Sequence, residues 1–151
     1  MINTKVDLPT GFKFVENADE ADYERVSVLL NAFGLNDGDA EIQRRTFKAS
    51  NGVEFIHDHD NLIACGRILS DDISQSAIYN IAVDENYHDR HIGSALMQRI
   101  KERYGHTNMV LYTHPSTVSW YENLGFSNLN TGMIIFNQED ISWFKQEKFI
   151  K

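Results

Sequence analysis

The fold is decided by residues 78–96, which read IYNIAVDENYHDRHIGSAL. An apolar run from Ile78 to Val83 suits a buried strand, and the polar group Asp84 to Asn86 interrupts it. Apolar residues at helical spacing start at Ile92. The stretch therefore predicts a strand that leads directly into the N-terminus of a helix.

A helix N-terminus of this kind favours an anionic ligand. Its first backbone N–H groups have no intrahelical partner, and the helix dipole adds about half a positive charge there. Gly93 allows a ligand to approach the backbone closely, and Arg90, with His88 and His91, supplies side-chain cations. We expect a phosphate group to bind at this junction; the alternative is an ordinary junction without a ligand.

The composition indicates a single globular domain. The chain has 151 residues, of which 42% are hydrophobic and 11% aromatic, which is ordinary for a folded protein with its own core. We expect one domain over residues 1–151. The formal net charge of -8 opposes binding to nucleic acid or to an anionic membrane and favours a cationic partner such as an amine.

Cysteine usage and hydropathy indicate a cytoplasmic protein. Cys65 is the one cysteine, so no internal disulfide can form. No stretch approaches the roughly 20 apolar residues of a membrane span, and no N-terminal run resembles a signal peptide. The histidine pairs His57 with His59 and His88 with His91 complete no recognised ligand spacing, so we expect no metal site.

Apolar periodicity and turn residues predict an α+β order of elements. Strands are expected at 11–15, 53–56, 62–69, 77–83 and 108–113, then from 125–126 and at 133–136, with helices at 21–33, 40–49, 92–104 and 116–123. Gly34 should end the first helix, Asp37 to Asp39 should start the second, and Ser116 should cap the fourth. The apolar tail after Gln138 is expected to pack on the domain as an amphipathic helix, with a contact between subunits as the alternative.

Residues 81–96 resemble the acetyl-CoA signature of the GNAT superfamily of N-acetyltransferases, in which a strand is followed by Gln/Arg-x-x-Gly-x-Gly/Ala and a helix. In the register set by the apolar residues, His88 falls at the Gln/Arg position, His91 at the middle Gly and Gly93 at the final Gly. The frame Arg90-x-x-Gly93-x-Ala95 also satisfies the letters, but it shifts the helix start, so the first frame is preferred. His91 then places a Cβ where the family usually has none.

A second motif, Trp120-Tyr121-Glu122-Asn123-Leu124-Gly125-Phe126, is similar to the Phe-Tyr-x-x-x-Gly-Phe segment of the same family. Together the two motifs carry a resemblance over residues 77–136, in the order that the family has them. The resemblance implies an α+β fold with a mixed, mostly antiparallel sheet and helices on both faces. It also implies that strands near 80–83 and 110–113 splay apart to admit the pantetheine arm of the cofactor.

The resemblance implies direct transfer of an acetyl group from acetyl-CoA to a primary amine of a small molecule or peptide, within a ternary complex. Tyr121 would donate a proton to the departing thiolate, and backbone N–H groups around Ile81 to Val83 would bind the oxyanion. His114 is a candidate base, a ligand contact or a plain surface histidine, and several family members use a water chain instead. The residues implied in acetyl-CoA binding are Ile81, Ala82, Val83, His88, Asp89, Arg90, His91, Ile92, Gly93, Ser94, Thr117, Trp120 and Tyr121.

A different class of function stays open beside this one. The chain could bind CoA or another phosphorylated ligand without turning it over, as a sensor or interaction module. The acidic composition favours a cationic acceptor such as a polyamine, an aminoglycoside or a lysine side chain. A homodimer held through the apolar tail is the remaining expectation about partners.

Overall fold

The computed structural model describes residues 7–32 and 38–151. The chain forms two compact units, Met1–Leu111 and Tyr112–Lys151. The first unit holds the sheet and the three longest helices, and the second holds short helices and an aromatic cluster. The expected helix end at Phe33 and Gly34 and the expected helix start at Asp37 lie outside the described residues.

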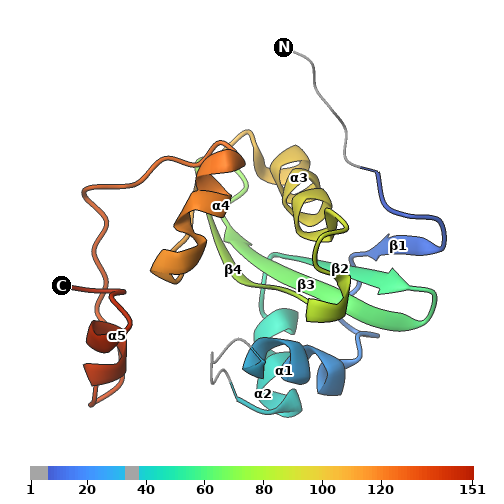
Figure 1. The fold of residues 1–151 in the computed structure, drawn as a ribbon, viewed down its shortest axis with the longest axis horizontal. Coiled ribbons are helices and arrows are strands. Elements are labelled where there is room, and N and C mark those ends of the chain that lie inside the picture. The colour runs from blue at the N-terminus through green and yellow to red at the C-terminus, as the bar shows by residue number, and fades with distance from the viewer. Residues whose placement is uncertain (1–6, 33–37) are drawn as a thin grey trace. The chain divides into compact units, whose positions relative to one another are not determined.

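The first unit is built on a five-stranded sheet with the strands in sequence order (Figure 1). Its strands are β1 (Phe12–Val15), β2 (Gly52–Asp58), β3 (Asn61–Ser70), β4 (Gln75–Val83) and β5 (Asn108–Val110). The first four pair antiparallel with their neighbours, and β5 pairs parallel with β4. This confirms the α+β class and the mixed, mostly antiparallel sheet.

Helices cover both faces of this sheet (Figure 1). On one face lie α1 (Tyr23–Asn31) and α2 (Ala40–Lys48), and on the other lies α3 (Ile92–Tyr104). Asp22 and Asp39 cap the first two helices, because their carboxylates accept the N–H groups of residues 25 and 42 at 3.1 and 3.0 Å. The bounds of α3 are those that the sequence predicts, with Gly105 as its C-cap.

Apolar residues follow one another in the strands because both faces of the sheet are covered by a hydrophobic core. Phe47 of α2 stacks on Phe55 of β2 with ring centroids 5.6 Å apart, and Tyr23 of α1 packs edge-on against Phe55. The next residue, Ile56, is also fully buried. Since side chains alternate between the faces of a strand, helices on both faces are needed to bury both residues.

Three expectations about the later part of the chain are wrong. β5 ends at Val110 rather than at residue 113, and no strand forms at 125–126 or 133–136. Met133 and Ile135 are 98% and 97% exposed. An extended apolar segment becomes a strand only when a neighbour pairs its backbone, and none of the described residues does so here.

The fourth expected helix is divided in two. A 3-10 turn, η2 (Pro115–Thr117), precedes α4 (Val118–Asn123), whose N-cap is Thr117 and not Ser116. The Ser116 N–H is used by the His114 ring, which accepts it at 3.1 Å. That local hydrogen bond favours a tight turn before the helix starts.

The apolar tail packs within the second unit. Phe144, on the short helix α5 (Ser142–Gln146), stacks on Phe136 with centroids 3.7 Å apart. Phe149 packs edge-on against Tyr112 and Phe144. The tail therefore folds back on an aromatic cluster of its own unit. Within the described residues, no helix combines the length and apolar character needed to cross a membrane.

A buried carboxylate joins the sheet to α3. Glu54 of β2 is fully buried, and its Oε2 atom lies 3.1 Å from Arg99 Nε and 3.2 Å from Arg103 Nη1. Its Oε1 atom has no hydrogen-bond partner among the described residues. Burial raises the pKa of Glu54 above its ordinary value, although the two guanidinium groups oppose that shift.

The raised pKa of Glu54 predicts a pH dependence of stability. Because the folded protein binds this proton more readily than the unfolded chain, wild type gains stability as the pH falls from the raised pKa toward the ordinary value of 4.5. We therefore expect chemical denaturation to show that the free energy of unfolding of wild type, relative to that of Glu54→Gln, increases as the pH is lowered. Glu16→Gln, at an exposed partner of the same arginines, is the matched control. A difference that is constant with pH would contradict the prediction.

Candidate functional site

The segment between β4 and α3 is tied to α1 at its first residue. The Asp84 carboxylate forms an ion pair with Arg25 of α1 and accepts the Asn86 N–H at 2.8 Å. Arg25 also donates from Nε to the Leu62 carbonyl at 2.9 Å. Burial acts to raise the pKa of Asp84, but the Asn86 N–H and the Arg25 guanidinium outweigh it, so the pKa lies below its usual value. Asp84 is therefore an anion that fixes where the segment leaves the strand.

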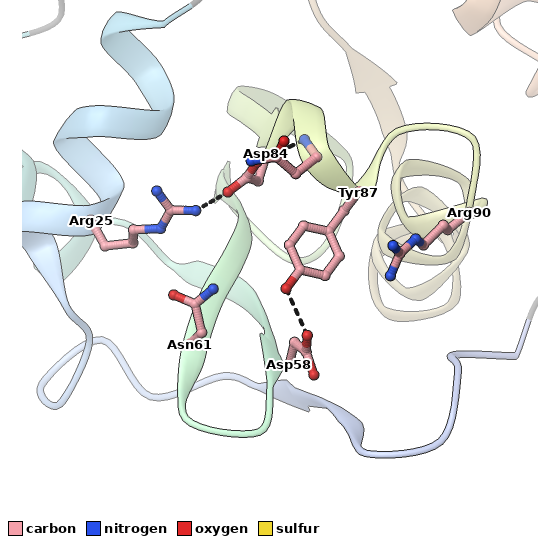
Figure 2. Close-up of a pocket in the computed structure, with 7 residues that line it drawn as sticks. Arg25, Asp58, Asn61, Asp84, Tyr87 and Arg90 are labelled. Atoms are coloured by element: carbon pink, nitrogen blue, oxygen red, sulfur yellow. Dashed lines mark hydrogen bonds and ion pairs between the residues drawn. The ribbon is translucent and has the colours of Figure 1, made fainter.

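A polar pocket of about 670 Å³ lies beside this segment (Figure 2). Two of its lining residues are hydrogen-bonded to each other: the hydroxyl of Tyr87, on the turn η1 (Glu85–Tyr87), donates to Asp58 Oδ2 at 2.6 Å. The Arg90 guanidinium lies 5.0 Å from the centre of the Tyr87 ring, and Asn61 and Arg25 line the other side. These contacts hold the Arg90 end of the segment against the turn between β2 and β3.

Helix α3 begins without a capping side chain. Its N-cap residue is His91, in the left-handed conformation with φ of 59°. The first intrahelical hydrogen bond runs from the Ala95 N–H to the His91 carbonyl at 3.0 Å, so the N–H groups of Ile92, Gly93 and Ser94 precede it. A helix of 13 residues that starts with three such donors provides a site for an anion such as a phosphate.

The three basic residues of the segment have different contacts. Arg90 lies on Tyr87, as described above, and His88 turns back to β4, where its Nε2 atom lies 3.0 Å from the Val83 carbonyl. Because a carbonyl can only accept, Nε2 of His88 carries a proton. His91 supplies the left-handed turn into the helix, and Asp89 also has a positive φ of 69°. The helix start at Ile92 agrees with the frame that places His91 at the middle glycine of the signature.

Within the described residues, the edge of β4 that faces β5 has no paired strand beyond the third residue of β4; we call this the open edge. β4 pairs with β5 only through Gln75, Ser76 and Ala77, and no strand of the described chain pairs with that edge further along. On the other edge the Asp84 N–H donates to the Ile63 carbonyl of β3 at 2.8 Å. Since amide directions alternate along a strand, the N–H groups of Val83 and Ile81 face the open edge. The first unit thus joins an open strand edge to an uncapped helix.

Tyr121 lies on α4 in the second unit. Its ring packs edge-on against Trp120 at 4.8 Å and Phe126 at 5.7 Å between centroids. The Phe126 N–H donates to the Tyr121 carbonyl at 3.1 Å, which joins the end of the motif to its start. Burial raises the pKa of Tyr121 to about 12, so its hydroxyl is a neutral proton donor at physiological pH.

His114 and Thr117, also in the second unit, are hydrogen-bonded to each other, and His114 is also hydrogen-bonded to the tail. The Thr117 hydroxyl donates to the His114 carbonyl at 2.9 Å. His114 Nε2 lies 3.0 Å from Glu147 Oε2, and its Nδ1 accepts the Ser116 N–H at 3.1 Å. A carboxylate accepts, so the proton of His114 is on Nε2 and the lone pair on Nδ1 is engaged by Ser116.

The predicted site residues lie close together along the chain, and the prediction did not include the residues that contact them from distant elements. The first unit brings together residues 81–83 and 88–94 at the strand end and helix start, and the second unit groups Thr117, Trp120 and Tyr121 on η2 and α4. Arg25 comes from α1, and Asp58 and Asn61 are the last residue of β2 and the first of β3; nothing in their local sequence indicates this role. No group of three metal-ligating side chains is found among the described residues.

The chain belongs to the GNAT acetyltransferase family, because the sequence model of the acetyltransferase (GNAT) domain matches residues 50–128. The matched range contains β2, β3, β4 and α3 and ends just after the tyrosine motif. No curated protein sequence matches the chain.

Solved structures show the same fold at low sequence identity. A provisionally assigned acetyltransferase from Deinococcus radiodurans R1 superposes with a TM-score of 0.74 at 20% identity, covering 85% of this chain and 90% of that one. A GNAT family acetyltransferase from Streptococcus pneumoniae has a TM-score of 0.71 at 24% identity, covering 85% and 99%. Glucosamine-6-phosphate N-acetyltransferase from Arabidopsis thaliana has a TM-score of 0.58 at 17% identity, covering 84% and 99%.

The left-handed N-cap predicts the effect of a glycine at position 91. A residue with a Cβ in this conformation costs about 1 kcal/mol, and glycine loses a similar amount in chain entropy, so His91→Gly should change stability by less than about 1 kcal/mol. It should tighten CoA binding, measured by calorimetry at pH 8, because the Cβ no longer narrows the approach to the backbone. Asp72→Gly relieves a positive φ in the turn between β3 and β4, away from the helix start, and should leave affinity unchanged. Weaker binding by His91→Gly would contradict this prediction.

Proposed function

We propose that this protein transfers an acetyl group from acetyl-CoA to a primary amine, directly within a ternary complex. Family membership implies an acetyl-CoA donor and an amine acceptor. The observation that carries the proposal is that the path of the chain runs from the open edge of β4, through the segment 84–91, to the uncapped N-terminus of α3. Such a path offers strand-like hydrogen bonds to the amide groups of pantetheine and N–H donors to a diphosphate.

The chain's own groups on this path have distinct roles in the proposal. The N–H groups of Ile92, Gly93 and Ser94 bind the diphosphate, with the Arg90 and His91 side chains beside them. Ala82 and Val83 lie along the pantetheine arm, and the Val83 N–H donates to it. The Ile81 N–H is the proposed donor to the oxyanion that forms when the amine attacks the acetyl carbonyl.

Two side chains of the second unit are proposed to move protons. As the new C–N bond forms and the C–S bond breaks, Tyr121 gives its proton to the departing thiolate, a role that its neutral phenol supports. Thr117 and Trp120 are proposed to line the cofactor beside it. His114 is the proposed base for the amine proton, and its Nδ1 atom must first exchange Ser116 for the substrate amine or for water.

Binding of CoA and turnover with amines test this proposal together. Calorimetry with CoA should show binding, and a thiol-release assay with acetyl-CoA and a panel of polyamines, aminoglycosides and lysine peptides should show turnover with at least one acceptor. The acidic net charge favours cationic acceptors in the panel. Binding without turnover across the panel would support a sensor of CoA instead, and absence of binding would refute both.

Tyr121→Phe tests the proton donor. Loss of general acid catalysis should lower kcat by about 100-fold, with little change in the dissociation constant of CoA. Because the pKa of Tyr121 is about 12, wild-type activity should show no decline from loss of this proton between pH 8 and pH 10. Tyr112→Phe, in the aromatic cluster of the same unit, is the matched control and should keep full activity. Full activity of Tyr121→Phe would remove the assignment.

A further inference from the structure

β4 contains an irregularity that the proposed function does not explain. Its register with β3 pairs Ala82 with Cys65 and Tyr79 with Arg67. Asn80 and Ile81 therefore both face a single residue of β3, Gly66, which defines a β-bulge. Asn80 takes up the extra length in the left-handed conformation, with φ of 57°.

The bulge is held at the side chain and at the backbone of Asn80. Arg67 Nε donates to Asn80 Oδ1 at 2.5 Å, and the Cys65 thiol donates to the Asn80 carbonyl at 3.4 Å. Arg67 is itself fixed, because its guanidinium lies 5.0 Å from the centre of the Tyr79 ring and donates from Nη1 to Ser50 Oγ at 3.5 Å. A side chain held by three neighbours has little freedom left, so the contact from Arg67 to Asn80 is preorganised.

Gly66 leaves space for the side chain of Ile81, the second residue of the bulge. A Cβ at position 66 would lie 2.5 Å from Ile81 Cδ1, and the next nearest atom, Ile100 Cδ1 of α3, would lie at 3.6 Å. The Ile81 side chain therefore occupies the space that any residue larger than glycine would need. With its side chain held there and Asn80 clamped before it, the peptide unit between Asn80 and Ile81 has one orientation.

We propose that Arg67 and Asn80 form a clamp that aims the Ile81 N–H at the acetyl carbonyl of acetyl-CoA. This inference rests on the proposed function and adds two positioning residues to it. Stabilisation of an oxyanion depends on a donor that is already aimed where the charge develops. The clamp should therefore affect kcat, while the diphosphate site at α3, built from other residues, keeps its affinity for CoA.

Substitutions at position 80 separate the clamp from backbone strain. Asn80→Gly keeps the left-handed conformation but loses the oxygen that Arg67 binds, whereas Asn80→Asp keeps both. We expect Asn80→Gly and Arg67→Gln to lower kcat by about tenfold or more, with the dissociation constant of CoA within about twofold of wild type. Asn80→Asp should retain most of the activity. Thermal melting checks folding, and Arg67→Lys is the milder variant if Arg67→Gln unfolds.

An amide resonance gives a readout that does not depend on turnover. In wild type, the ¹⁵N–H signal of Ile81 should move further with acetyl-CoA than with CoA, because only the former presents a carbonyl; in Asn80→Gly this difference should disappear. Two results would overturn the clamp and leave the proposed function standing. One is a kcat of Asn80→Gly equal to that of wild type. The other is binding of both CoA and acetyl-CoA by wild type with equal shifts of the Ile81 signal. Failure of wild type to bind CoA would overturn the proposed function and the clamp with it. Loss of CoA binding in a folded Asn80→Gly would also overturn the clamp.

Discussion

The partial pairing of β4 is the constraint on which the rest of the structure depends. Three of its nine residues pair with β5, while most of its other edge pairs with β3. A strand with an unpaired edge exposes N–H and C=O groups that need partners. In this fold the unpaired edge of β4 is followed along the chain, after the segment 84–91, by the uncapped first N–H groups of α3.

These backbone groups can bind a ligand only if their positions are fixed, and side chains from distant parts of the chain fix them. The ion pair between Arg25 and Asp84 joins the exit of β4 to α1, and the contact of Tyr87 with Asp58 joins the next turn to β2. At the middle of β4, Arg67 and Asn80 do the same for the bulge. Each support is a charge-assisted or short hydrogen bond between elements, which is the kind of contact that restricts geometry most strongly.

The sequence predicted the elements that depend on local pattern. The bounds of α3 follow from its apolar spacing and from Gly105, and the hairpin of β2 and β3 follows from two β-prone runs around a polar turn. It failed where a strand needs a partner, because residues 133–136 are apolar but no described residue pairs with their backbone. It also missed the bulge, since Asn80 lies in an apolar run and its conformation depends on Arg67 and Gly66 of the neighbouring strand.

By itself the sequence determined the junction between strand and helix and the bounds of α3, because neighbouring residues carry all of that information. Only the tertiary structure decided which N–H groups face the open edge and what holds them there. Register, bulge position and the ion pair from α1 arise from contacts between residues far apart in the chain. Contacts of that kind leave no periodic signal in the local sequence, so they are visible only once the sheet has formed.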